Sequence, residues 1–398
     1  MTDPVLKSLI VRRFRSIPAE TVHFDNPTFL VGHNGSGKSN VRDAVDFLAE
    51  AMSSPLQSAF KRRGGISIVR NRTPGKSYPT NLGLGAVLGR INGSISGARY
   101  SFEIKAHKDY GFEVIREQCL IDLPEGTAYF DRRRGKVESN VEGVRPSLEP
   151  DSLGLPIISG ESTFAPVVQT LARMRSYAID PSKLRGDEEA NGAANLRPDG
   201  SNLASVLQEI GRRKPDDLAR IGELLAAVVP NTTNVATVKR ENRLALEFTQ
   251  EWGQRKRLKF KSLSMSDGTL RALGLLVAVY QCPTPSVLVI EEPEATIHPG
   301  ALGAILDLIR HASRQMQVIV TTHSPEVLDA EWLREENLRI VTWEEGATRV
   351  LPLAIGTRES LREHLAGPGE LLRSNALRPT QVAPGIAPEA ILFQDVRA

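Results

Sequence analysis

A glycine-rich loop near the amino terminus constrains the fold of this chain more than any other feature of its sequence. The stretch from Gly32 to Ser39 reads G-x-x-x-x-G-K-S and follows a short apolar run at residues 28–31. After the loop, apolar residues recur at helical spacing, at Val41, Ala44, Val45, Leu48 and Met52. In a strand, loop and helix of this kind, backbone N–H groups and the helix N-terminus surround a polyphosphate. The sequence therefore predicts a nucleoside-triphosphate site in an α/β fold.

The residues of this phosphate loop have distinct expected roles. Lys38 neutralises the β- and γ-phosphates, and the Ser39 hydroxyl is a ligand for the Mg²⁺ that accompanies them. The nucleotide-binding residues that we expect are Gly32, Asn34, Gly35, Ser36, Gly37, Lys38, Ser39 and Asn40. The alternative is a glycine-rich turn that matches by chance, and the flanking strand and helix patterns argue against it.

Bulk composition is that of an ordinary globular protein. The 398 residues suggest two or three units, with 40% hydrophobic and 24% charged residues. No apolar run reaches the ~18 residues needed to cross a bilayer, and the amino terminus lacks the pattern of a secretion signal. The two cysteines, Cys119 and Cys282, lack metal-ligand spacing. We therefore expect a cytoplasmic protein without structural zinc; a net charge of +3 does not by itself indicate nucleic acid.

A second apolar run, residues 286–290, ends in the carboxylates of Glu291 and Glu292. A central strand delivers such acids to its carboxyl end, beside the phosphate loop. Glu291 is then expected to hold Mg²⁺, and Glu292 to accept a proton from the water that attacks the γ-phosphate. The alternative is a strand that runs into a solvated acidic turn, and the phosphate loop upstream favours the catalytic interpretation.

A strand, helix and strand follow from residue 286 onwards. The helix is expected from about Gly300 to Gln315 and the next strand at residues 317–322, so the two strands should be parallel neighbours. His323 should then emerge near Glu292, where it can bond a γ-phosphate or the attacking water. The alternative is a histidine that caps its own turn.

The segment Ser266-Asp267-Gly268 precedes an apolar helix and offers free N–H groups to an anion. Because the phosphate loop already surrounds its own phosphates, this second anion site is expected to contact the γ-phosphate held by another copy. The alternative is that these residues are a simple N-cap of the helix, in which case they need no function in binding.

These segments, in this order, resemble the ABC ATPases of the RecF/SMC-like branch. The resemblance covers roughly residues 5–355. It includes the loop with Asn34 and Asn40, the phrase Phe-Arg-Ser-Ile at residues 14–17, and the Glu-Glu-Pro-Glu of residues 291–294, which is similar to the acidic motif of OLD-like and RecF-like members. It implies a P-loop NTPase fold of the ABC-ATPase head type, with a mixed central sheet, an antiparallel β-subdomain and a helical insertion.

The resemblance also implies a homodimer that holds two ATP molecules, with Glu292 as general base and His323 as γ-phosphate sensor. Two departures stand out. Glu291 replaces the usual Asp, and Asp267 places a carboxylate where it repels a phosphate unless it points away. Gln118 and Gln169 both remain candidates for the adenine-side glutamine of the family.

Four parts are expected along the chain. They are an N-terminal lobe with the phosphate loop and antiparallel strands (1–150), a mainly helical insertion (151–235), a C-terminal lobe with the signature, acidic motif and histidine (236–355), and a tail (356–398). Sustained heptads are absent, so we expect a compact head without a coiled-coil arm. After His323 there is no cluster of carboxylates that would indicate an appended nuclease. The Pro-, Gly- and Ala-rich end of the tail is expected to fray, and the alternative is that the tail packs on the head or docks a partner.

Three basic clusters offer candidate contacts to DNA. The main one is a strand with one wet face, comprising Arg255, Lys256, Arg257, Lys259 and Lys261. The other two are residues 132–136 and 212–214. On one surface they could follow a phosphodiester backbone. The alternative for each cluster is a solvated strand or helix end.

The sequence thus predicts an ATPase that dimerises around ATP and works in DNA repair or in defence against foreign DNA, with a separately encoded effector protein as a candidate partner. The alternative is an ATP-dependent assembly switch with little turnover that regulates such an effector. A transporter subunit is disfavoured, because the signature is Ser-Asp-Gly-Thr rather than Ser-Gly-Gly-Gln.

Overall fold

The computed structural model describes residues 2–71, 81–107, 111–190, 192–193, 195–252, 256–381 and 390–395. The chain forms two compact units. The N-terminal unit takes residues 2–174, 334–365 and 376–398, and the middle unit takes residues 175–333 and 366–375. Each unit draws on separate stretches of the chain, and the four-part division along the sequence stays a prediction.

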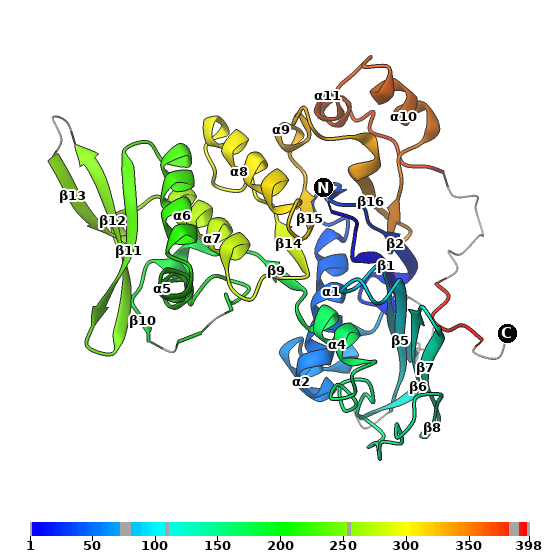
Figure 1. Ribbon diagram of the computed structural model, residues 1–398. Helices are drawn as coiled ribbons and strands as arrows, with labels where there is room; N and C mark the ends of the chain where they lie inside the picture. Colours follow the sequence, from blue (N-terminus) through cyan, green and yellow to red (C-terminus); the bar gives the residue numbers. More distant parts are fainter. Residues whose placement is uncertain are drawn as a thin grey trace. The chain divides into compact units, whose positions relative to one another are not determined.

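The N-terminal unit contains ten strands and several helices among its described residues (Figure 1). Its elements are β1 (Leu6–Phe14), β2 (Ile17–His23), β3 (Thr28–Val31), α1 (Lys38–Ser53), α2 (Leu56–Arg62), α3 (Ile66–Val69), β4 (Asn81–Leu88), β5 (Gly97–Ala106), β6 (Phe112–Leu123), β7 (Gly126–Arg133), β8 (Lys136–Ser139), α4 (Ala165–Ala172), η3 (Glu335–Asn337), β16 (Leu338–Glu344), β17 (Ala347–Leu351) and α10 (Ile355–Arg362).

A seven-stranded antiparallel sheet, in the order β2-β1-β4-β5-β6-β7-β8, dominates this unit. The expected antiparallel β-subdomain is thereby confirmed. It is larger than expected, because β1 and β2 add to strands β4–β8. Alternate residues of β5 (Tyr100, Phe102 and Ile104) are fully buried, as the pleat of a strand with one covered face requires.

A smaller group of strands in the same unit supports the phosphate loop. β3 pairs in parallel with β16, and β16 pairs antiparallel with β17. All four residues of β3 are buried, and the apolar side chains expected on α1 (Val41, Ala44, Val45, Leu48 and Met52) are buried too. The strand, loop and helix expected around the loop are confirmed.

The carboxylate of Glu117, in the middle of β6, holds a long loop against the sheet. It is fully buried and accepts hydrogen bonds from the N–H groups of Gly154 (2.6 Å) and Leu155 (2.9 Å) and from the Tyr100 hydroxyl (2.9 Å). Burial raises the pKa of Glu117, and these hydrogen bonds oppose that rise. The loop's position therefore depends on one buried acceptor.

Arg132 belongs to one of the basic clusters expected to reach DNA, and for this residue the expectation is wrong. Its side chain is 1% exposed and donates to the carbonyls of Ser152 and Glu149. On β7, residue 132 points inward and Arg133 outward, so a run of three arginines does not form one solvated surface.

The middle unit begins with β9 (Figure 1). Its elements are β9 (Arg175–Tyr177), η1 (Pro181–Leu184), β10 (Glu188–Glu189), α5 (Leu203–Arg213), α6 (Pro215–Val228), β11 (Thr232–Arg240), β12 (Arg243–Trp252), β13 (Lys256–Lys261), η2 (Ser262–Ser264), α7 (Asp267–Tyr280), β14 (Val287–Glu291), α8 (Pro299–Ala312), β15 (Gln317–Thr322), α9 (Pro325–Leu328) and α11 (Pro368–Arg373).

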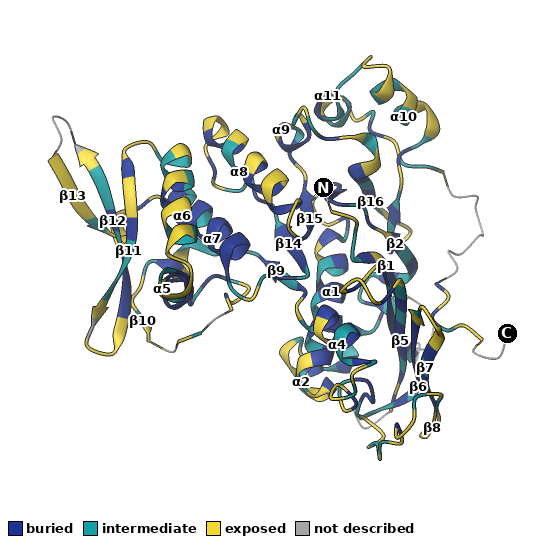
Figure 2. Ribbon diagram, viewed as in Figure 1, coloured by how far each residue is buried: buried dark blue, intermediate teal, exposed yellow. Residues whose placement is uncertain are grey.

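Parallel strands form the core of the middle unit. β14 pairs in parallel with both β9 and β15, and α8 connects β14 to β15, so the expected β-α-β unit is confirmed. Figure 2 shows α7 as a largely buried helix, whereas β13 is almost wholly exposed. β13 is an edge strand that pairs with β12, in a separate antiparallel sheet with β10 and β11.

The tail departs from expectation. Residues 390–395 do not fray, because Ala390 and Leu392 are buried against Ile10 of the seven-stranded sheet. Among the described residues, no helix is long and apolar enough to cross a membrane.

We expect Glu117→Ala to lower the free energy of unfolding of the N-terminal unit by about 3 kcal/mol, because two buried N–H groups and a buried hydroxyl lose their acceptor. Chemical denaturation monitored by circular dichroism measures this change. The matched control is Glu113→Ala on the same strand, where the side chain is 37% exposed and pairs with Lys105. The control should cost about 0.5 kcal/mol or less; equal losses in both variants would contradict the assignment.

Candidate functional site

The phosphate loop connects β3 to α1 in the N-terminal unit. Gly35 and Gly37 have φ angles of +80° and +102°, which favour glycine, and Gly37 is the N-cap of α1. Left-handed residues that alternate with right-handed ones aim successive N–H groups into one concavity, which binds anions. The loop therefore has the backbone conformation that a polyphosphate requires.

Side chains of the loop fit the same ligand. Lys38 is 5% exposed, and its ammonium donates to the carbonyls of Gly32 (2.6 Å) and His33 (3.1 Å). The hydroxyl of Ser36 is buried and has no hydrogen-bond partner among the described residues. Asn34 and Gly35 of the loop and Ser39 in the first turn of α1 are exposed. A buried cation and an unsatisfied buried hydroxyl at a helix N-terminus suit an oxyanion ligand.

Thr348 and Ser16 hold the loop in place, and the sequence did not indicate Thr348. Thr348 on β17 donates to the carbonyl of Ser36 (3.1 Å), and its hydroxyl lies 2.6 Å from that of Ser16. The Asn40 amide donates to the Ser16 hydroxyl. A Cβ on Gly37 would lie 1.9 Å from the Thr348 hydroxyl oxygen. Ser16 belongs to the Phe-Arg-Ser-Ile phrase, which was part of the family resemblance. No sequence pattern pointed to Thr348.

The acidic turn lies in the middle unit, at the carboxyl ends of β14 and β15. Glu292 has a φ of +43°, and its N–H donates to the Thr321 carbonyl (3.0 Å). Its Oε1 lies 3.2 Å from Nδ1 of His323. Both side chains are well exposed, at 36% and 41%. The proximity that the parallel strands predicted is observed.

Glu294 orients the same turn and was not assigned a role from sequence. Its Oε1 accepts from the Thr322 hydroxyl (2.7 Å) and from the His323 N–H (3.4 Å). The side chain is only 11% exposed, and its other oxygen is buried without a hydrogen-bond partner in the described part of the chain. Glu294 thus fixes the backbone that carries His323.

Arg271 on α7 links the signature helix to the acidic turn, and sequence reasoning missed it as well. Its Nη2 donates to the carbonyls of Glu291 (3.0 Å) and Glu292 (2.9 Å), and its Nη1 donates to that of Ile179 (3.1 Å). Burial lowers the pKa of Arg271, and the nearby carboxylates, Glu294 first among them, oppose that shift.

The signature segment starts α7. Ser266 is the N-cap, and its Oγ accepts from the Thr269 N–H (3.2 Å). Ser266 and Asp267 are both exposed. The Asp267 carboxylate pairs with Arg185, which also donates to the Met265 carbonyl (2.9 Å). The negative charge that departs from the family pattern is therefore compensated within the same unit.

Residue 268 must be glycine because the backbone of another loop approaches it closely. A Cβ there would lie 2.7 Å from the carbonyl oxygen of Thr296, in the loop that follows the acidic turn. No larger residue fits without moving that backbone.

The two expected metal ligands lie in different units. Ser39 is exposed in the first turn of α1, and Glu291 is half-buried at the end of β14. Within the described ranges, no three or more His, Cys, Asp or Glu side chains gather as a metal site. A hydroxyl and a carboxylate are hard oxygen ligands that fit Mg²⁺ held largely by phosphates and water.

The basic strand is less basic than its sequence suggests. Lys259 pairs with Glu247 (2.8 Å), Arg257 lies 3.8 Å from Glu251, and Arg255 lies outside the described residues. The expectation of one wet face is wrong: all residues of β13 are exposed except the half-buried Phe260. β13 is an edge strand, paired only on the side of β12 among the described residues.

Gln118 cannot serve as the adenine-side glutamine in this conformation. It is 2% exposed, and its amide bonds both main-chain groups of Gln394. Gln169 on α4 is exposed, so it alone of the two candidates has a free surface. Its role stays a prediction.

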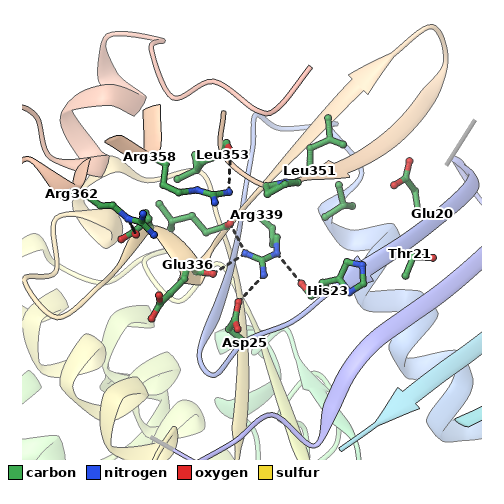
Figure 3. A pocket seen from close by; sticks show the side chains of 14 residues that line it. Glu20, Thr21, His23, Asp25, Glu336, Arg339, Leu351, Leu353, Arg358 and Arg362 are labelled. Atoms are coloured by element: carbon green, nitrogen blue, oxygen red, sulfur yellow. Dashed lines mark hydrogen bonds and ion pairs between the residues drawn. The ribbon is translucent and has the colours of Figure 1, made fainter. Parts of the chain in front are cut away.

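The N-terminal unit also contains a cavity of about 540 Å³ beside β2, β16 and α10 (Figure 3). Arg339 at its centre donates to the carbonyl of His23 (2.9 Å), to that of Glu336 (2.8 Å) and to the Asp25 carboxylate (2.7 Å). None of the residues expected to bind nucleotide lines this cavity. Arg339 acts there as a structural brace.

Solved structures with the same fold are heads of SMC proteins. An SmcHead bound to the C-winged helix domain of ScpA matches with a TM-score of 0.57 and 15% identity, over 90% of this chain and 100% of that one. An Smc head domain with an extended coiled coil, bound to the C-terminal domain of ScpA derived from Pyrococcus furiosus, matches with a TM-score of 0.51 and 13% identity, over 91% and 99%. These similarities confirm the ABC-ATPase head fold.

A curated relative and a family profile agree with that fold. The Old nuclease of Escherichia phage P2 is 19% identical over an alignment of 364 residues, and the match covers 82% of this chain and 57% of that protein. The chain thus spans little more than half the length of this relative. The profile described as "AAA domain, putative AbiEii toxin, Type IV TA system" matches residues 28–329. Because that match covers well over half of the sequence, the chain belongs to this family of ABC/SMC-like P-loop ATPases.

Proposed function

We propose that this chain binds ATP and hydrolyses it with Glu292 as general base. The observation that carries the proposal is the contact between Glu292 Oε1 and His323 Nδ1, 3.2 Å long, at the carboxyl ends of two parallel strands. The Glu292 carboxylate takes the proton of the water that attacks the γ-phosphate. The contact at Nδ1 orients the His323 ring, and its Nε2 then hydrogen-bonds the γ-phosphate.

Lys38 and the N–H groups of the phosphate loop hold the β- and γ-phosphates, with Asn34 and Asn40 at the edges of the loop. Ser39 and Glu291 would hold Mg²⁺, which offsets phosphate charge when bound. The fit rests on the left-handed glycines, the buried Lys38 and the unsatisfied Ser36 hydroxyl. Glu291 reaches one methylene further than the Asp of the family.

Dimerisation around ATP follows from the second anion site. Ser266 caps α7 and is exposed, so its helix N-terminus can face a phosphate held by another copy. Arg185 compensates the Asp267 charge, which removes the main electrostatic objection. We therefore propose a homodimer in which Ser266, Asp267 and Gly268 of one copy contact the nucleotide of the other.

The proposed biological setting is DNA repair or defence against foreign DNA. A phage relative named a nuclease and a family description that names a TA-system toxin both support it. The SMC heads that share the fold are bound to a ScpA domain, which supports a separately encoded partner protein. Lys256 and Lys261 on β13 make no ion pair within the described residues and are the best candidates for DNA contacts.

Glu292→Gln should lower ATP turnover by about 10²- to 10⁴-fold, because the amide cannot accept the proton. Nucleotide affinity should be retained, and a nucleotide-bound dimer should accumulate in size-exclusion chromatography with light scattering. Glu331→Gln, at an exposed position of the same unit, is the matched control. Wild-type turnover no higher than that of Glu292→Gln would instead favour the assembly switch.

Gly37→Ala should abolish ATP binding, whereas Gly35→Ala should weaken it only by about ten-fold or less. Both glycines have positive φ, but only at Gly37 does an added Cβ collide with Thr348; no atom lies within 4 Å of a Cβ on Gly35. Isothermal titration calorimetry with a non-hydrolysable ATP analogue measures both affinities. Lys38→Ala should match Gly37→Ala, and unchanged affinity in either would refute the phosphate-loop assignment.

If DNA stimulates turnover, Lys256→Glu with Lys261→Glu should remove the stimulation and flatten the salt dependence of DNA binding. Lys259→Glu should have a smaller effect, because Lys259 already pairs with Glu247. ATPase assays across a salt series with and without duplex DNA provide the measurement. Equal stimulation in all variants would mean that β13 is only a solvated edge.

A further inference from the structure

The C-terminal segment, residues 390–395, lies across one face of the seven-stranded sheet as an extended peptide. It contacts side chains of β1, β4, β5 and β6 without pairing with any strand in the described part of the chain. Figure 1 shows it as the red trace beside this sheet. The segment and these strands all belong to the N-terminal unit.

Apolar anchors alternate along the segment. Ala390 and Leu392 are 8% and 2% exposed and pack on Ile10, whereas Ile391 between them is 55% exposed. Leu392 fills a notch over Gly83 on β4, where a Cβ would lie 2.3 Å from its Cδ1. The absence of a side chain at residue 83 therefore makes the seat for Leu392.

Polar groups of the sheet recognise the main chain of the segment. The Gln118 amide donates to the Gln394 carbonyl (3.0 Å) and accepts from the Gln394 N–H (3.0 Å). The Gln118 amide also donates to the Asp131 carboxylate on the neighbouring strand (3.3 Å), a contact within the sheet that orients it independently of the segment. Arg99 donates to the Ile391 carbonyl, and the Arg116 guanidinium lies 4.2 Å from the centre of the Phe393 ring.

We infer that this face is a peptide-binding site whose ligand is the chain's own C-terminal segment, exchangeable with the same segment of a second copy. The notch, the Gln118 amide and the Arg116 guanidinium together recognise a linear motif of the pattern Ala-x-Leu-Phe-x, in which the last residue is held through its main chain. A tether supplies an effective concentration on the order of a millimolar, so a weakly binding segment stays docked in its own chain. A second copy carries the same segment and meets the same receptors. This inference is independent of the nucleotide chemistry.

The test uses the full chain with Leu392→Asp, which should release its own segment and leave the site open. A fluorescein-labelled peptide with the sequence of residues 390–395 should bind this variant in fluorescence anisotropy and should bind the wild type at least about ten-fold more weakly, because the tethered segment competes. Adding Gly83→Ala to the Leu392→Asp chain should remove binding by closing the notch. Absence of peptide binding to the Leu392→Asp chain, or equal binding to all three proteins, overturns the inference.

Matched peptides and a second measurement separate docking from misfolding. A peptide with the Ile391→Ala change should bind like the original, and one with Leu392→Ala should bind about ten- to a hundred-fold more weakly. In the full chain, chymotrypsin should cut after Phe393 faster in Leu392→Ala than in Ile391→Ala, once each rate is divided by that of the free peptide. Equal normalised rates would mean that Leu392 does not anchor the segment.

Discussion

The proposed chemistry of the middle unit depends on the hydrogen bonds that the Arg271 guanidinium makes to the acidic turn. The guanidinium donates to the carbonyls of Glu291 and Glu292, next to a turn in which Glu292 has a φ of +43°. A non-glycine residue in that region costs about 1–3 kcal/mol. A hydrogen bond to a charged group contributes roughly 1.5–3 kcal/mol, so two of them offset the strain. Arg271 therefore keeps the Glu292 carboxylate where His323 can reach it.

The same side chain joins two parts of the site that a partner copy and a nucleotide would each touch. Ser266 and Arg271 lie on one helix, α7, whose apolar residues are almost all buried. Gly268 adds a second tie, because its backbone packs against the Thr296 carbonyl beyond the acidic turn. The helix N-terminus and the acidic turn cannot shift independently without breaking these contacts. The contact that we propose at Ser266 would thus be mechanically linked to the position of Glu292.

Features encoded by local periodicity could be predicted from the sequence, and features that need distant partners could not. The strand, loop and helix around the glycine-rich motif and the parallel β14–α8–β15 unit follow from that motif and from runs of apolar residues, and these elements were confirmed. Thr348, by contrast, supports the loop from 332 residues beyond Ser16 in the chain. Nothing near Thr348 in sequence indicates that contact, because it depends on the pairing of β17 with β16 and of β16 with β3 and on the bond from the Thr348 N–H to the Ser16 carbonyl (2.9 Å).

The surroundings of two charged residues were also misjudged from the sequence, because their partners lie far away in the chain. Arg132 looked like part of a solvated basic run, but carbonyls of a loop about twenty residues away accept from its guanidinium and allow its burial. Asp267 looked like an obstacle to phosphate, but Arg185, which precedes it by eighty-two residues, neutralises it. The field at a helix N-terminus depends on such pairs and not on the formal charges of neighbouring residues. With Asp267 paired, the anion site that we propose at the start of α7 would keep the attraction of a helix N-terminus for negative charge, and the altered signature is compatible with the phosphate ligand that we propose.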